Sequence, residues 1–135
     1  EQLLSLPESS LKGTKSQPSF FKLVEGDVMM HYPYGRLFNV ENLEEEAKRF
    51  EAKDIAPAGL LPGKKTKLAE GTAGLIEAPF AEDINLNGAR RYAWIQVTDI
   101  QKNYVEEKAH YELSFSLPKG CYATNVLDVL RGGQA

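Results

Sequence analysis

A strict alternation of apolar and polar side chains runs from Tyr111 to Leu117, near the end of the sequence. A period of two is typical of a β-strand with one covered face, so we predict a strand here. Pro118 lacks a backbone N–H donor and Gly120 tolerates a positive φ, which favours a tight turn directly after the strand. Lys119 is then held at this turn.

The period changes after the turn. Apolar residues now recur at positions that share one face of a helix, namely Ala123, Val126, Leu127 and Leu130. Thr124 can cap this helix at its start, and Gly132 is a residue type that commonly ends one. Residues 111–131 therefore predict a strand, a turn and a helix.

Two further patterns lie in the first half of the chain. Residues 28–32 are rich in apolar side chains, a turn follows at Pro33, and residues 37–40 are mostly apolar again, which indicates a β-hairpin. Residues 41–53 carry Leu43, Ala47 and Phe50 at helical spacing, with acids early and basic residues later. We predict a helix here and interpret its acidic run as a solvated face.

The remaining segments carry weaker signals. Proline and glycine punctuate residues 55–63, which predicts a loop, and residues 69–76 can form a short helix. Residues 91–97 are dense in aromatic and β-branched side chains and predict a strand, with Trp94 in the core. Residues 98–108 are largely polar and predict a connection.

The composition changes near residue 83, and this predicts two parts. Residues 1–83 carry 10 Lys/Arg against 14 Asp/Glu, a net charge of −4, whereas residues 84–135 carry 6 against 5, a net charge of +1. Residues 1–19 are rich in Ser, Lys and Pro and predict a flexible lead. The fold class that these patterns predict is α+β, with a small mixed α/β domain over 1–83 and a strand–strand–helix segment over 84–135.

Composition also limits the functions that the chain can have. The net charge of −3 gives no general affinity for nucleic acid, so any RNA contact must use local basic clusters. The single Cys121 excludes an internal disulfide framework and favours a reducing compartment, and no apolar run is long enough to cross a membrane. We expect a cytoplasmic protein. Because the chain starts at Glu1 rather than Met, we also expect it to be a fragment.

Several of these segments resemble one family. Residues 113–127 read Leu-Ser-Phe-Ser-Leu-Pro-Lys-Gly-Cys-Tyr-Ala-Thr-Asn-Val-Leu, and residues 87–92 read Asn-Gly-Ala-Arg-Arg-Tyr. The first is similar to the closing segment of the tRNA pseudouridine synthase D family, and the second to the family's Gly-x-Arg-Arg strand opening. Residues 26–38 and 59–63 resemble the domain inserted into these enzymes. The likeness runs in order along most of the chain.

The resemblance implies a fold and an activity. Residues 1–83 would be the inserted domain, and residues 84–135 would be the C-terminal piece of a larger antiparallel catalytic sheet. The complete enzyme would isomerise uridine to pseudouridine in the D-arm region of tRNA, using one aspartate and no cofactor or metal. A target base in folded RNA must first be unstacked.

The resemblance assigns no catalytic residue to this chain. The family's aspartate belongs to an N-terminal Gly-x-x-Lys-Asp motif, and none of the aspartates here has that context. They are Asp27, Asp54, Asp83, Asp99 and Asp128. The two histidines also lack neighbours at metal-ligand spacing, so we predict no metal site. We expect the chain alone to be inactive, and whether it should be called an enzyme stays open.

The residues that the resemblance leaves as RNA-facing are basic or aromatic: Arg90, Arg91, Lys119, Tyr122, Lys64, Lys65 and Lys67. Lysine and arginine suit phosphate contacts because their charge acts on the backbone whatever the base. Ordinary surface charge is the alternative for each basic residue. Tyr122 could stack on a base or lie in the core.

Three classes of function stay open at this point. The first is a part of the synthase, the second a free-standing small RNA-binding module without catalysis, and the third an interaction protein whose basic clusters have no function. The expected partners are tRNA and either a second copy of the chain or a complementing N-terminal catalytic part. Two strands and one helix in the C-terminal segment cannot bury all their apolar side chains, which favours such association.

Overall fold

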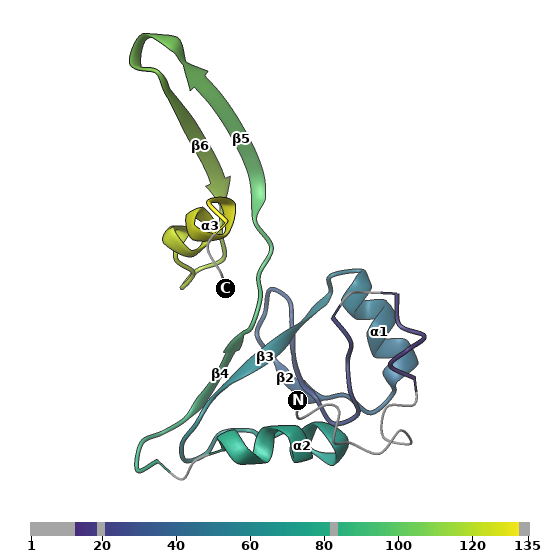
Figure 1. The fold of residues 1–135 in the computed structure, drawn as a ribbon. Helices are drawn as coiled ribbons and strands as arrows, with labels where there is room; N and C mark the ends of the chain where they lie inside the picture. The colour runs from purple at the N-terminus through teal and green to yellow at the C-terminus, as the bar shows by residue number, and fades with distance from the viewer. Residues whose placement is uncertain (1–12, 19–20, 82–83, 133–135) are drawn as a thin grey trace. The chain divides into compact units, whose positions relative to one another are not determined.

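The structure, a computed structural model, describes residues 13–18, 21–81 and 84–132 (Figure 1). It confirms the α+β class with antiparallel sheets. The strands are β1 (Val28–His31), β2 (Leu37–Asn39), β3 (Ile55–Leu61), β4 (Ala89–Tyr92), β5 (Thr98–Val105) and β6 (His110–Ser116). The helices are α1 (Leu43–Glu51), α2 (Gly71–Glu77) and α3 (Ala123–Leu130), with 3-10 turns η3 (Ala78–Phe80) and η4 (Glu106–Lys108).

Four strands form one antiparallel sheet in the order β2-β1-β3-β4. Successive side chains of a strand point to opposite faces, so β1 supplies two cores. Met29 packs with Ile55 and Phe50 on one face, whereas Val28 and Met30 pack with apolar side chains on the other. The predicted hairpin of residues 28–40 is confirmed as β1 and β2.

Helix α1 covers the first of these faces. Asn42 caps it by accepting a hydrogen bond from Glu45 N at 3.3 Å, and Ala47 and Phe50 are buried. Glutamates in the first turn and Lys48 and Arg49 in the last turn suit the helix dipole. The predicted helix and its apolar face are confirmed.

The predicted loop at residues 55–63 is wrong over most of its length, because residues 55–61 form β3 between β1 and β4. Pro57 lacks an N–H, but its carbonyl accepts a hydrogen bond from Ala93 N at 2.8 Å. Burial of Ile55, Ala56 and Ala58 between two neighbours outweighs the low strand propensity of proline and glycine.

The two segments that follow α2 also differ from the prediction. The strand predicted over 91–97 is instead β4, which begins at Ala89 and ends at Tyr92. Trp94 lies in a bend rather than in mid-strand, although its ring does pack on the first core, 5.3 Å from that of Phe50. The irregular connection predicted over 98–108 is wrong, because these residues form the strand β5, which pairs with β6, and the 3-10 turn η4. Most side chains of β5 are exposed, so no apolar alternation marks it.

The predicted strand and helix at residues 111–131 are confirmed as β6 and α3, with one correction. The residue before α3 is Tyr122, and no side chain caps the helix, so the predicted Thr124 cap is wrong. Gly120 and Gly132 have φ of +89° and +75°, in agreement with a turn before the helix and an end after it.

The chain forms two compact units, which divide between Trp94 and Ile95. Strand β4 belongs to the first unit, although the composition-based boundary at residue 83 assigns it to the second part, and that boundary stays a prediction. The described part of the N-terminal lead, residues 13–18, belongs to the first unit. There Gln17 is buried and both of its amide atoms bond the backbone of Leu23 at 2.7 Å. Residues 1–12 lie outside the described ranges.

Candidate nucleic-acid interface

Three of the basic residues predicted to face RNA lie on the segment between β3 and α2. We call residues 64–67 the basic loop; it contains Lys64, Lys65 and Lys67. Lys64 begins it with a parallel bridge to Asn87, in which Lys64 N donates to Leu86 O and Gly88 N donates to Lys64 O. Residues 85–88 thus form one wall of the loop.

Two glycines permit this close approach. A Cβ atom on Gly63, where φ is +144°, would lie 2.5 Å from Gly88 N. A Cβ atom on Gly88 would lie 1.8 Å from Thr66 Oγ1. Both distances are far below van der Waals contact, so the loop can take this path only with glycine at these positions.

The backbone of the loop is held along its length. Thr66 Oγ1 donates to Gly63 O at 3.0 Å, Lys67 O accepts from Arg90 Nε at 2.7 Å, and Leu68 O accepts from Asn39 Nδ2 at 3.2 Å. The loop is therefore an ordered part of the fold. Its three lysine side chains are exposed.

The lysines differ in what they contact. Lys64 Nζ donates to Asn85 Oδ1 at 2.5 Å, whereas Lys65 and Lys67 have no side-chain partner within the described ranges. An exposed ammonium on an ordered backbone can meet a phosphate without first breaking an ion pair. Lys65 and Lys67 are the most available cations of the loop.

Arg90 does not lie where a phosphate contact requires it. Its side chain is only 3% exposed. Nε donates to Lys67 O, Nη1 donates to Ala58 O at 3.0 Å, and Nη2 pairs with Glu77 Oε1 at 2.5 Å. The guanidinium is committed to protein acceptors, which corrects the expectation that both arginines face RNA alike.

Glu77 was not among the residues singled out from the sequence. Burial raises the pKa of Glu77, but the hydrogen bonds from Arg90 and Ala69 N and the Arg90 charge outweigh burial, so its pKa lies below the ordinary value. Nothing local marks this residue, because its partner Arg90 is 13 positions away and on another element.

Arg91 points to the opposite face of β4 from Arg90, as strand alternation requires. Its side chain is exposed, and its neighbour across the strand is Gly59, which offers no side chain to cover it. Of the two arginines, Arg91 is the one that solvent and ligands can reach.

Lys119 and Tyr122 lie in the second unit, at the turn before α3. Lys119 is exposed, and Tyr122 is 69% exposed. The core alternative for Tyr122 is therefore wrong within this chain, and its ring is free to stack.

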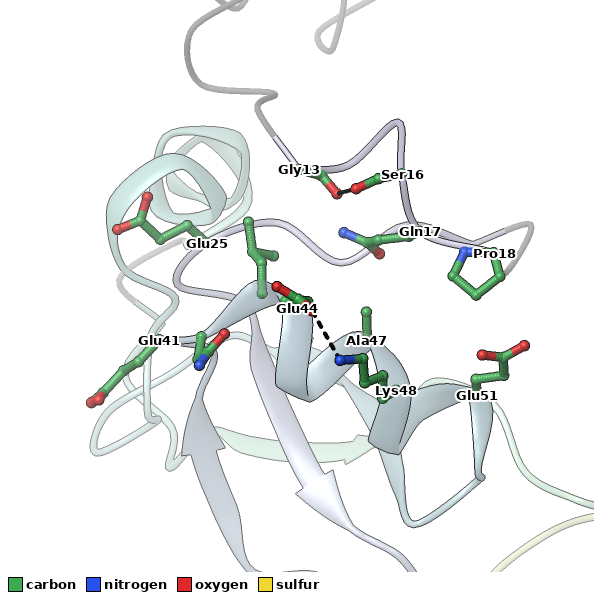
Figure 2. A pocket seen from close by; sticks show the side chains of 12 residues that line it. Gly13, Ser16, Gln17, Pro18, Glu25, Glu41, Glu44, Ala47, Lys48 and Glu51 are labelled. Atoms are coloured by element: carbon green, nitrogen blue, oxygen red, sulfur yellow. Dashed lines mark hydrogen bonds and ion pairs between the residues drawn. The ribbon is translucent and has the colours of Figure 1, made fainter.

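A cavity of about 1090 Å³ lies between residues 13–18 and α1 (Figure 2). Figure 2 shows Glu25, Glu41, Glu44 and Glu51 around it against one cation, Lys48, which pairs with Glu44 at 2.9 Å. An excess of carboxylates repels phosphate, so this cavity does not suit RNA. Among the described residues there is also no cluster of His, Cys, Asp and Glu that could hold a metal ion, and no helix able to span a membrane.

The fold and these side chains define an α+β segment with an ordered basic loop and further exposed cations. Comparison with known proteins identifies it further. The family model of tRNA pseudouridine synthase D (TruD) matches residues 12–129. The chain therefore belongs to the tRNA pseudouridine synthase D family.

Individual relatives agree with the family model. A tRNA pseudouridine synthase D of Sulfurimonas denitrificans is 51% identical over 128 residues, which are 95% of this chain and 36% of that protein. One of Wolinella succinogenes is 49% identical over 126 residues, which are 93% and 35%. A crystal structure from Methanosarcina mazei, assigned to tRNA pseudouridine synthase D, superposes with a TM-score of 0.58 at 25% identity and covers 78% of this chain and 30% of that one. The chain thus spans about a third of the length of these relatives.

Proposed function

We propose that this chain is part of a tRNA pseudouridine synthase that isomerises uridine to pseudouridine in the D-arm region of tRNA. The observation that carries the proposal is the family match over residues 12–129, together with 51% identity to a relative of which this chain covers 36%. The chain alone is inactive in this proposal, because breaking and re-forming the glycosidic bond is assigned to residues outside it.

The role of the chain in this proposal is to hold tRNA. Lys64, Lys65, Lys67, Arg91 and Lys119 are exposed and can neutralise phosphates, which positions RNA without reading its bases. The exposed ring of Tyr122 can stack on a base or sugar. Arg90 is left out of these contacts because its side chain is buried and bonded.

The partners in the proposal are tRNA and the rest of a synthase, in the cytoplasm. Strands β5 and β6 form a sheet of only two strands, and Tyr111, Leu113 and Leu130 are among the large apolar side chains left exposed. Such a surface supports association with a complementing catalytic part. A second copy of the chain is the alternative occupant.

An assay of pseudouridine in tRNA tests the proposal. The purified chain and the complete Sulfurimonas denitrificans relative would be incubated separately with unmodified tRNA, and pseudouridine would be mapped by chemical labelling and primer extension. We expect a D-arm product with the relative and none with the chain. Turnover by the chain that is lost when one of its own aspartates is replaced would contradict the assignment of chemistry to residues outside it.

The tRNA affinity of the chain, measured with and without the rest of a synthase, distinguishes this proposal from a free-standing RNA-binding module. A module without catalysis would bind tRNA equally well whether or not the rest of a synthase is present. We expect instead that the chain alone binds weakly, given its net charge of −3, and that its tRNA affinity rises when the complementing part is added.

A further inference from the structure

Arg90 and Glu77 form a buried pair directly behind the basic loop. Arg90 is 3% exposed and Glu77 is 16% exposed, and their side chains meet at 2.5 Å. Leaving either partner alone in such a site costs far more free energy than a surface pair gains. Arg90 and Glu77 also form hydrogen bonds with backbone groups of other segments, and these bonds indicate which part of the fold the pair stabilises.

Each residue of the pair also forms a hydrogen bond with the backbone at, or just after, the C-terminal end of the basic loop. Arg90 Nε donates to Lys67 O at 2.7 Å, and Glu77 Oε1 accepts from Ala69 N at 3.0 Å. Arg90 Nη1 reaches Ala58 O in β3. One guanidinium thus ties the end of the basic loop to the central strand and, through Glu77, to α2.

We propose that Arg90 and Glu77 are positioning residues for tRNA binding, which act by fixing the basic loop so that Lys65 and Lys67 meet phosphates from a preformed backbone. This inference rests on the RNA-binding role proposed above. Preorganisation favours binding because the cost of ordering the loop is met when the protein folds. Arg90 itself touches no RNA in this account.

The geometry separates this role from direct contact. A guanidinium can bond in three directions at once, as Arg90 does, whereas a lysine ammonium at the end of a flexible chain cannot reproduce that fork. Arg90→Lys keeps the charge and removes the tie. If Arg90 acted as a phosphate contact, Arg90→Lys would largely keep tRNA affinity.

The test measures tRNA affinity of the whole chain by fluorescence anisotropy at several KCl concentrations. We expect Arg90→Met and Arg90→Lys to lower affinity alike, by about threefold to tenfold, because the loosened loop must then be ordered when RNA binds. The slope of log affinity against log salt should stay unchanged, because no phosphate contact is lost. Lys65→Met and Lys67→Met should each reduce that slope by about one unit.

Amide hydrogen exchange measures the order of the loop backbone in the absence of RNA. Exchange of the Ala69 amide, whose N–H donates to Glu77 Oε1, should become faster in Arg90→Met because Glu77 loses the partner that holds it. The matched control is Arg91→Met, which removes the same charge from the opposite face of the same strand and should leave exchange in the loop unchanged. The double variant Glu77→Gln with Arg90→Met avoids a stranded buried carboxylate, and it should show the same loosened loop if Arg90→Met alone fails to fold.

The outcomes are distinct. Two results would overturn the positioning role while leaving tRNA binding in place. The first is amide exchange in the loop that stays unchanged in both Arg90→Met and the double variant. The second is wild-type tRNA affinity in Arg90→Lys together with a smaller salt slope in Arg90→Met. If the wild-type chain binds no tRNA even at low salt and with the complementing part present, the RNA-binding proposal fails, and this inference fails with it.

Discussion

Adjacent residues of similar chemistry have different roles in this chain. Arg90 is buried behind the basic loop and Arg91 is exposed on the other face of β4, although a basic pair in sequence predicts one role for both. Alternation along a strand separates them. Of the basic residues predicted to face RNA, the three lysines of the loop, Arg91 and Lys119 are exposed.

Asp27 gives a prediction at the same scale. Burial raises the pKa of Asp27, partly offset by the hydrogen bond from Val24 N, and Glu77 adds to the rise while Arg90 opposes it. A folded-state pKa above the unfolded value means that stability falls as pH rises through that folded pKa, so the ionised carboxylate costs free energy at pH 7. We expect Asp27→Asn to raise the free energy of unfolding at pH 7, and the gain to disappear near pH 3.

Urea unfolding at the two pH values measures this effect. Asparagine keeps an oxygen that can accept from Val24 N, whereas the control Asp27→Ala leaves that N–H unpaired and should cost about 1–3 kcal/mol. A stability loss with Asp27→Asn at pH 7 would show that the charge is stabilising, contrary to this account.

At the scale of elements, the basic loop depends on glycine. Gly63→Ala combines an unfavourable φ of +144° with a Cβ atom 2.5 Å from Gly88 N, and we expect it to lower the free energy of unfolding by about 3 kcal/mol. Gly35→Ala is the control, since φ is +74° but the nearest atom would be 3.6 Å away, and it should cost about 1 kcal/mol. Equal costs for the two variants, measured by thermal or urea unfolding, would mean that the loop relaxes away from the glycine.

The two sheets should also differ in local stability. A sheet of two strands is marginal in water, and the side chains of β5 and β6 are mostly exposed. We expect amides of β5 and β6 in the dilute chain to exchange about 100-fold faster than those of β1 and β3, since opening free energies range from near zero to the global value. Association with a complementing part or a second copy should slow them. Strong protection in a dilute monomer would contradict the need for association.

Local signals explain which elements the sequence predicts. Helix α1 carries its own cap, charge order and apolar face, and the hairpin of β1 and β2 carries its own turn. Strand β3 does not, because Pro57 and Gly59 read as loop residues until both neighbouring strands are in place. Strand β5 is set by its pairing with β6 rather than by apolar periodicity.

Some features of the candidate site can likewise be predicted from the sequence, and others are visible only in the fold. The three lysines of the basic loop are close together in the sequence, and the structure shows that their side chains are exposed, whereas their contact with RNA stays a prediction. The pair of Arg90 with Glu77 joins β4 to α2 and is visible only in the fold. For the same reason a basic motif alone cannot distinguish a residue that contacts RNA from one that supports the loop.

We propose that the chain as a whole is a working part of a tRNA pseudouridine synthase. Family membership and a 128-residue match at 51% identity support it, and the remaining two thirds of the relative offer a means to test it. Local variants of the isolated chain cannot test it, because the chemistry is assigned elsewhere.

The most direct measurement is the activity of a chimera. The matching 128 residues of the Sulfurimonas denitrificans relative would be replaced by those of this chain, and pseudouridine in the D-arm of unmodified tRNA would be quantified beside the parent enzyme. We predict that the chimera forms pseudouridine at the parent's position, and that Lys65→Met with Lys67→Met in the chimera weakens tRNA binding. A folded chimera that binds tRNA but forms no pseudouridine, or forms it at another position, would contradict the claim.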